Sequence, residues 1–138
     1  MPKVFTAASA NRTLPLVRRI VEDLVRDYAR WQQQLAACEV AAAVADSARD
    51  PATLALQREV QALAGQIEQY VDELTSLGAE PREPYDSGLV DFPGEVDGRP
   101  IYLCWRLGES SIEYWHEIAA GFPGRQPIHS LPASADTP

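Results

Sequence analysis

Hydrophobic residues recur at alternating spacings of four and three over residues 14–45, and again over residues 51–77. The first series consists of Val17, Val21, Leu24, Tyr28, Trp31, Leu35, Cys38, Ala42 and Ala45. The second series consists of Leu56, Val60, Leu63, Ile67, Tyr70, Leu74 and Leu77. This heptad spacing is typical of helices that pack through a coiled-coil seam. The pattern therefore predicts two long helices.

Capping residues and helix breakers mark the ends of the two predicted helices. Thr6 is a candidate N-cap for the first helix, and Asp50 followed by Pro51 suits the start of the second. Gly78 is a plausible stop after the second seam. Because the connection is short, we predict that residues 6–77 form an antiparallel helical hairpin.

The two seams differ in width along the hairpin. Ile20, Val25 and Val71 broaden the apolar stripe at one end, which needs a further layer of chain to cover it. The other end, around Ala36–Ala45 and Pro51–Ala62, is narrow and rich in alanine. A thin arm of this kind is often buried by a second copy of the chain, so we predict a homodimer.

After the hairpin the period of the hydrophobic pattern changes to two. Residues 89–96 and 99–106 flank Asp97-Gly98, a strong signal for a two-residue β-hairpin turn. Such a turn pairs Asp91 with Cys104 and creates one apolar face, made of Val90, Phe92, Ile101, Leu103 and Trp105. The predicted class is α+β, with a three-stranded antiparallel meander over residues 88–117 and an ordered Gly/Pro loop over 118–130.

The third strand of the meander is predicted to follow a turn at LGES. It places Ile112, Tyr114 and His116 in the apolar row. Trp115 then lies on the opposite face as a cross-strand neighbour of Tyr102.

Length and composition narrow the class of protein. The 138 residues suit a single domain, predicted over 1–130 with a flexible tail over 131–138. The net charge of −8 argues against nucleic acid and anionic membranes as partners. No apolar run approaches the length of a membrane span or resembles a signal peptide, so we predict a cytoplasmic protein with Cys38 and Cys104 as free thiols.

Three long motifs resemble a bacterial family that is catalogued as a domain of unknown function. They are FTAASANRTLPLV, GLVDFPGEVDGRPIYLCWRLGE and IEYWHEIAAGFPGRQPI, and together they extend over most of the chain. The resemblance implies no activity. Ser9 stands where relatives of this type tend to have an acidic residue, which weakens the expected capping box with Thr6.

Few residues have the chemistry of a catalytic or metal site. Asp91, Cys104, Glu113 and His116 are weak metal-ligand candidates, because no spacing such as HExxH or CxxC supports them. Cysteine catalysis is disfavoured, since the predicted register puts Cys104 and His116 on opposite faces. Arg106 is diagonal to Asp91 and is predicted to pair with it.

The GFPGRQPI segment carries Arg125 in an irregular backbone. Arg125 is either structural, paired with Asp91, Glu117 or Glu109, or part of a corner that binds a small anion.

We predict a non-enzymatic module that dimerises through its hairpin and needs no cofactor. It presents its sheet and loop to a protein partner or a small anionic ligand, through Asp91, Tyr102, Arg106, Trp115, His116, Glu117 and Arg125. The alternative is a metal- or anion-dependent enzyme whose site contains His116, Glu117, Arg125 and Asp91.

Overall fold

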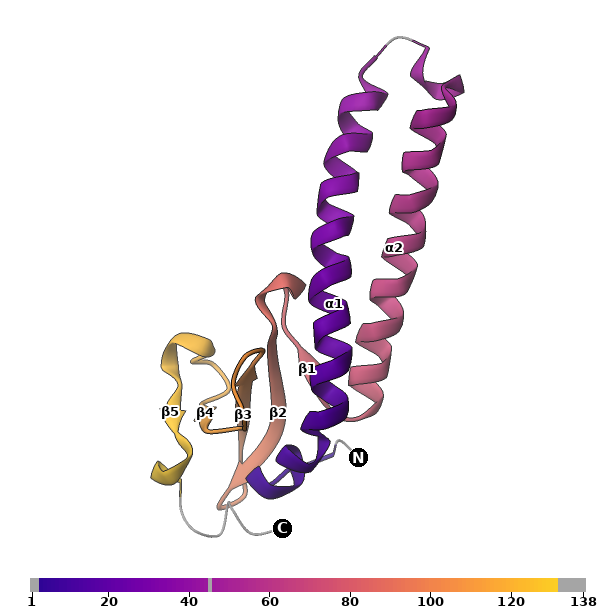
Figure 1. Ribbon diagram of the computed structural model, residues 1–138. Helices are drawn as coiled ribbons and strands as arrows, with labels where there is room; N and C mark the ends of the chain where they lie inside the picture. Colours follow the sequence, from indigo (N-terminus) through magenta and orange to yellow (C-terminus); the bar gives the residue numbers. More distant parts are fainter. Residues whose placement is uncertain (1–2, 45, 132–138) are drawn as a thin grey trace.

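A long helical hairpin stands beside a small antiparallel sheet in the computed structural model, which describes residues 3–44 and 46–131 (Figure 1). Helix α1 spans Ala7–Ala42 and helix α2 spans Pro51–Ser76, with a 3₁₀ turn, Ser47–Arg49, between them. The α+β class and the helical hairpin are confirmed. The predicted flexible tail covers residues 131–138. Of these, all but Leu131 lie outside the described residues.

The sheet has five strands and not the predicted three. In spatial order they are β1 (Glu80–Pro81), β2 (Leu89–Val96), β3 (Arg99–Arg106), β4 (Tyr114–His116) and β5 (Gln126–Pro127). The two additional strands have two residues each, contain proline and form the edges of the sheet. A run of two residues is too short to show an alternating hydrophobic pattern, and proline lacks the N–H that a strand donates to its ladder. That is why the alternating pattern did not reveal them.

The central pairing of β2 with β3 agrees with the predicted register. Asp91 pairs with Cys104, Phe92 with Leu103, and Val96 with Arg99 across the turn. Asp97 and Gly98 both have positive φ angles, 51° and 79°, as a type I′ hairpin turn requires.

The register of β4 is shifted by one residue from the prediction. Tyr102 pairs with His116, Leu103 with Trp115, and Cys104 with Tyr114. A shift of one residue moves every side chain to the other face of a sheet. Trp115 is therefore on the apolar face and His116 on the opposite one, so both predicted faces were wrong.

The core lies between the apolar face of the sheet and helix α1, which is nearer to the sheet than α2 (Figure 1). From α1 it contains Ala10, Leu14, Val17, Ile20, Val21 and Leu24. From the sheet it contains Val90, Phe92, Ile101, Leu103, Trp105 and Trp115. Helix α2 contributes Ile67 and Leu74. The wide end of the hairpin is thus covered by the sheet, as its broader stripe requires.

Helix α1 begins with a complete capping box. The Ser9 N–H donates to Thr6 Oγ1 at 3.0 Å, and the Thr6 N–H donates to Ser9 Oγ at 2.9 Å. The expectation that Ser9 weakens this motif was wrong, because its hydroxyl accepts the bond that a carboxylate would otherwise accept.

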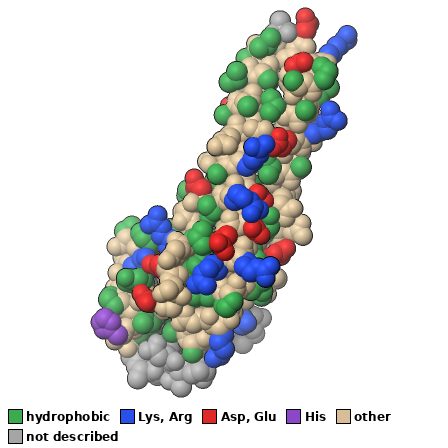
Figure 2. Space-filling model, in the orientation of Figure 1, with side chains coloured by type: hydrophobic (Ala, Val, Ile, Leu, Met, Phe, Trp, Pro, Cys, Tyr) green, Lys and Arg blue, Asp and Glu red, His purple; other side chains and the backbone are tan. Residues whose placement is uncertain are grey.

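The far half of the hairpin extends beyond the sheet. Leu24 is the last buried residue of α1, and Thr53 is the only buried residue of α2 before Ile67. Hydrophobic side chains are visible on the surface toward this end of the hairpin (Figure 2). Within the described residues, neither helix has the length and apolar character that crossing a membrane requires.

Candidate metal site

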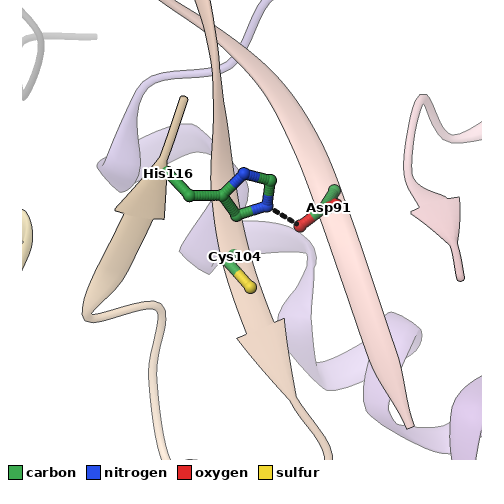
Figure 3. Close-up of side chains that lie close together, drawn as sticks. All are labelled: Asp91, Cys104 and His116. Atoms are coloured by element: carbon green, nitrogen blue, oxygen red, sulfur yellow. Dashed lines mark hydrogen bonds and ion pairs between the residues drawn. The ribbon is translucent and has the colours of Figure 1, made fainter. Parts of the chain in front are cut away.

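Three neighbouring strands bring Asp91, Cys104 and His116 together on the face of the sheet opposite the core (Figure 3). Asp91 comes from β2, Cys104 from β3 and His116 from β4. One carboxylate oxygen, the thiol sulfur and one imidazole nitrogen all lie within 4.8 Å of one another. All three residues are buried, with at most 5% of their surface exposed. The prediction that Cys104 and His116 lie on opposite faces was wrong.

Both ring nitrogens of His116 face hydrogen-bond acceptors. Nδ1 lies 2.7 Å from the main-chain oxygen of Glu117, and Nε2 lies 2.9 Å from Oδ1 of Asp91. A carbonyl oxygen only accepts, so Nδ1 carries a proton. The contact between Nε2 and Oδ1 is a hydrogen bond when a second proton lies between these two atoms, and a metal ion bound at both atoms would displace that proton.

The other oxygen of Asp91 is bound by an arginine from the linker before β2. Arg82 Nε donates to Asp91 Oδ2 at 2.7 Å, and Arg82 Nη2 lies 3.2 Å from Glu80 Oε1. Burial, the largest single effect, would lower the pKa of Arg82, but the hydrogen bond to Asp91, the charge of that carboxylate and the neighbouring Tyr102 hydroxyl together outweigh it and raise the pKa, so the guanidinium stays charged.

Sequence reasoning missed Arg82 and Glu80, because it treated this segment as linker. The alternation of Glu and Pro in EPREP, compatible with an edge strand, was the available signal.

Cys104 is a protonated thiol in this environment. Burial, reinforced by the negative charge of Asp91, raises its pKa to about 12. A free thiol with such a pKa is a poor nucleophile near neutral pH, because only the thiolate reacts. Burial of Cys104 therefore disfavours thiol catalysis, although Cys104 and His116 lie on the same face of the sheet. A bound metal ion would replace the thiol proton.

A small cavity adjoins the cluster. Its volume is about 170 Å³, and it is lined by Arg82, Leu89, Asp91, Cys104, Gly121 and Phe122. A water molecule occupies about 30 Å³ in the liquid, so the cavity has room for water or for a small ligand beside Asp91 and Cys104.

Tyr102 is next to the cluster, but Trp115 is not. The ring of Tyr102 is 5.6 Å from that of His116, and its hydroxyl donates to Glu80 at 3.0 Å. Trp115 is buried on the core face and donates from Nε1 to Ser130 Oγ at 2.8 Å. The predicted cross-strand pair of Tyr102 and Trp115 was therefore wrong.

Arg106 and Glu113 lie outside the cluster. Arg106 is exposed and stacks over the ring of Phe122 at 5.6 Å, while Arg82 holds the position on Asp91 that was predicted for Arg106. Glu113 precedes β4, is exposed, and accepts a hydrogen bond from Ser111. Its predicted place in the row of Asp91 and Cys104 was wrong, because Tyr114 pairs with Cys104.

Arg125 and Glu117 are engaged in separate ion pairs. Arg125 Nη2 donates to both carboxylate oxygens of Glu109 at 2.7 Å, and its guanidinium lies 4.0 Å from the centre of the Tyr114 ring. The carboxylate of Glu117 pairs with Arg99 at the surface. Of the four residues in the alternative enzyme site, the structure brings together the side chains of Asp91 and His116.

The fold and this cluster define an α+β protein, with a helical hairpin on one face of a sheet and a buried Asp–Cys–His group on the other. The chain belongs to the family described as "Uncharacterized conserved protein (DUF2203)", which matches residues 3–128. No curated protein and no solved structure matches it.

Proposed function

We propose that this protein binds a divalent transition-metal ion, with Zn²⁺ the best match, through Asp91, Cys104 and His116. The observation that carries the proposal is the convergence of one carboxylate, one thiol and one imidazole within 4.8 Å in a buried site. These are the ligand types that zinc prefers, and a thiolate disfavours Mg²⁺ and Ca²⁺. Ligand atoms around tetrahedral zinc are about 3.4 Å apart, so the distance of 2.9 Å between Nε2 and Oδ1 would widen on binding, and distances near the upper limit of 4.8 Å would shorten.

Outer contacts already orient two of the three ligands. The bond from His116 Nδ1 to the Glu117 carbonyl leaves Nε2 as the ligand atom, as is common for metal-bound histidines. Arg82 occupies Oδ2 of Asp91 and leaves Oδ1 on the side of His116. A thiolate and a carboxylate together balance the charge of a divalent ion, and the adjoining cavity supplies space for a fourth ligand.

Zinc titration of the full chain, after removal of metal with a chelator, tests the proposal. We expect one ion per chain by native mass spectrometry, and about 2.7 kcal/mol of added stability when free zinc is 100 times its Kd. Co²⁺ should give a sulfur-to-cobalt charge-transfer band that Cys104→Ser abolishes and Cys38→Ser retains. Because zinc displaces at least the thiol proton of Cys104, whose pKa is raised to about 12, zinc affinity should rise at least about tenfold per pH unit below that value.

His116→Gln should weaken zinc binding by at least about 100-fold. Loss of a group that only orients a metal ligand typically costs about 10- to 100-fold in affinity, and loss of a ligand itself should cost more. Equal zinc affinity in wild type and His116→Gln would contradict the proposal and assign any binding to surface carboxylates.

The far half of the hairpin favours a second function, which is homodimerisation. Val40, in the last turn of α1, and Val44, just beyond the end of that helix, are exposed by 72% and 64% and fall outside the predicted seam. Leu54 on α2 is also exposed. The residues nearby are mostly alanines, which allow another helix pair to approach closely. A second copy is the occupant we propose, in a four-helix arrangement.

The substitution Val44→Glu tests this second function. It should convert a dimer to a monomer in sedimentation equilibrium, because it would place two like charges in a symmetric apolar contact. Val4→Glu changes an exposed valine far along the chain and is the control. A wild-type monomer at high protein concentration would contradict homodimerisation without affecting the metal proposal.

A further inference from the structure

A second hollow lies near the middle of the hairpin, where α1, α2 and the segment Glu83–Tyr85 meet. It has a volume of about 260 Å³ and is lined by Tyr28, Trp31, Ala64, Ile67, Glu83 and Tyr85. An adjoining hollow of about 340 Å³ shares two of these residues and is lined by Ile67, Glu68, Val71, Asp72 and Tyr85. Together they form one groove, called here the aromatic groove. It shares no lining residue with the Asp91–Cys104–His116 cluster.

Three aromatic side chains form one wall of the aromatic groove. The ring centres of Tyr28 and Trp31 are 5.6 Å apart, and those of Tyr28 and Tyr85 are 5.8 Å apart with the planes at 87°. All three residues are partly buried, so part of each side chain stays accessible. The faces of such rings carry negative potential and attract cationic groups.

Acidic residues line the aromatic groove beside these rings. Glu83 accepts a hydrogen bond from the Tyr85 hydroxyl at 3.3 Å. Among the described residues, Glu68, Asp72 and Glu83 form no salt bridge. Aromatic faces beside carboxylates that lack a counter-charge are complementary to an organic cation.

The fold also leaves one donor in this wall without an acceptor. Nε1 of Trp31 is buried and has no hydrogen-bond partner in the described part of the chain. The other two tryptophans differ in this respect, since Trp105 donates to the Glu109 carbonyl at 2.9 Å and Trp115 to Ser130 at 2.8 Å. The indole N–H of Trp31 is therefore distinct from the other two and can report on a ligand that stacks on its ring.

We propose that the aromatic groove binds an arginine-containing segment of a partner protein. The side-chain stem packs on Ile67 and Tyr85, and the guanidinium lies over the aromatic rings beside Glu83. Arginine combines a charge, a planar face for stacking and an apolar stem. The net charge of −8 favours the approach of a basic segment. This surface is independent of the proposed metal and dimer functions.

The test uses the full chain labelled with ¹⁵N and two acetylated pentapeptides, Gly-Arg-Gly-Arg-Gly and the same sequence with citrulline in place of arginine. Citrulline has nearly the same shape as arginine but no charge. We expect the arginine peptide to shift the indole N–H signal of Trp31 in a saturable way, while Trp105 and Trp115 serve as internal references. Trp31→Phe identifies the signal.

Glu83→Gln should weaken binding of the arginine peptide about fivefold. Glu73→Gln removes the same charge from an exposed position of α2 that lines neither hollow, and should change the affinity less than twofold. Equal binding of the citrulline peptide, an unmoved Trp31 signal, or equal weakening by the two substitutions would each overturn the proposal. Glu83 is exposed, so its replacement should leave the fold intact.

Discussion

Replacing Asp91 with alanine should lower the free energy of unfolding by about 3–5 kcal/mol, measured by urea denaturation in the presence of a chelator. Asp91 is buried and accepts from Arg82 through Oδ2, while its Oδ1 contacts His116. Alanine leaves both partners without the carboxylate, and the His116 ring is buried. The loss therefore combines a missing ion pair with an unsatisfied imidazole.

Asparagine at position 91 separates stability from metal binding. Its amide can donate to Nε2 of a neutral His116 and accept from Arg82, so every contact survives and the loss should be only about 1 kcal/mol. The amide is a poor zinc ligand, so Asp91→Asn should still lose zinc affinity. Glu95→Ala, at an exposed position of the same strand, should change stability by less than about 0.5 kcal/mol. Equal losses for alanine and asparagine would contradict this account of the Asp91 contacts.

Replacing Arg125 with alanine should cost about 3 kcal/mol of unfolding free energy. The guanidinium binds Glu109, whose side chain is only 23% exposed, and stacks between Tyr114 at 4.0 Å and Phe122 at 4.7 Å. Alanine removes the stacking and leaves a partly buried carboxylate unpaired. Lysine should restore less than half of the loss, because it lacks the planar face. Thermal or urea unfolding measures both variants.

The ion pair between Arg99 and Glu117 provides the matched control for Arg125. Both of its side chains are largely exposed, by 53% and 44%, so Arg99→Ala should cost less than about 1 kcal/mol. If Arg125→Ala were no more destabilising than Arg99→Ala, the structural role of Arg125 would be wrong. The alternative interpretation of Arg125, as part of a corner that binds a small anion, would then be favoured.

The helical hairpin and the central strand pair were predictable because local patterns determine them. A heptad repeat specifies helices that pack along one stripe, and Asp97-Gly98 fixes the turn and therefore the register of β2 with β3. The pairing of Asp91 with Cys104 followed directly from that turn. Two of the three candidate metal ligands were thus placed correctly from the sequence.

The position of His116 was not predictable, because the chain between β3 and β4 does not follow a period of two. Ile112 and Trp115 are both buried in the core although they are three residues apart. A contact with the start of α1 helps to hold this segment, since the Ile112 N–H donates to Asn11 Oδ1 at 2.7 Å. A hydrogen bond between residues so distant in sequence leaves no local pattern. The third ligand therefore appears only when the fold is assembled.

The decrease in burial along the hairpin determines where local unfolding of the helices begins. Past Leu24 on α1, side chains are no longer buried, while the base of the hairpin is fixed by the sheet. Helical turns that lack tertiary packing are only marginally stable. Local unfolding should therefore begin near the inter-helix connection and proceed toward the sheet, as a sequence of partly frayed states with small free energies. Pairing with a second copy would suppress this fraying, so assembly and helical order at that end would be thermodynamically coupled.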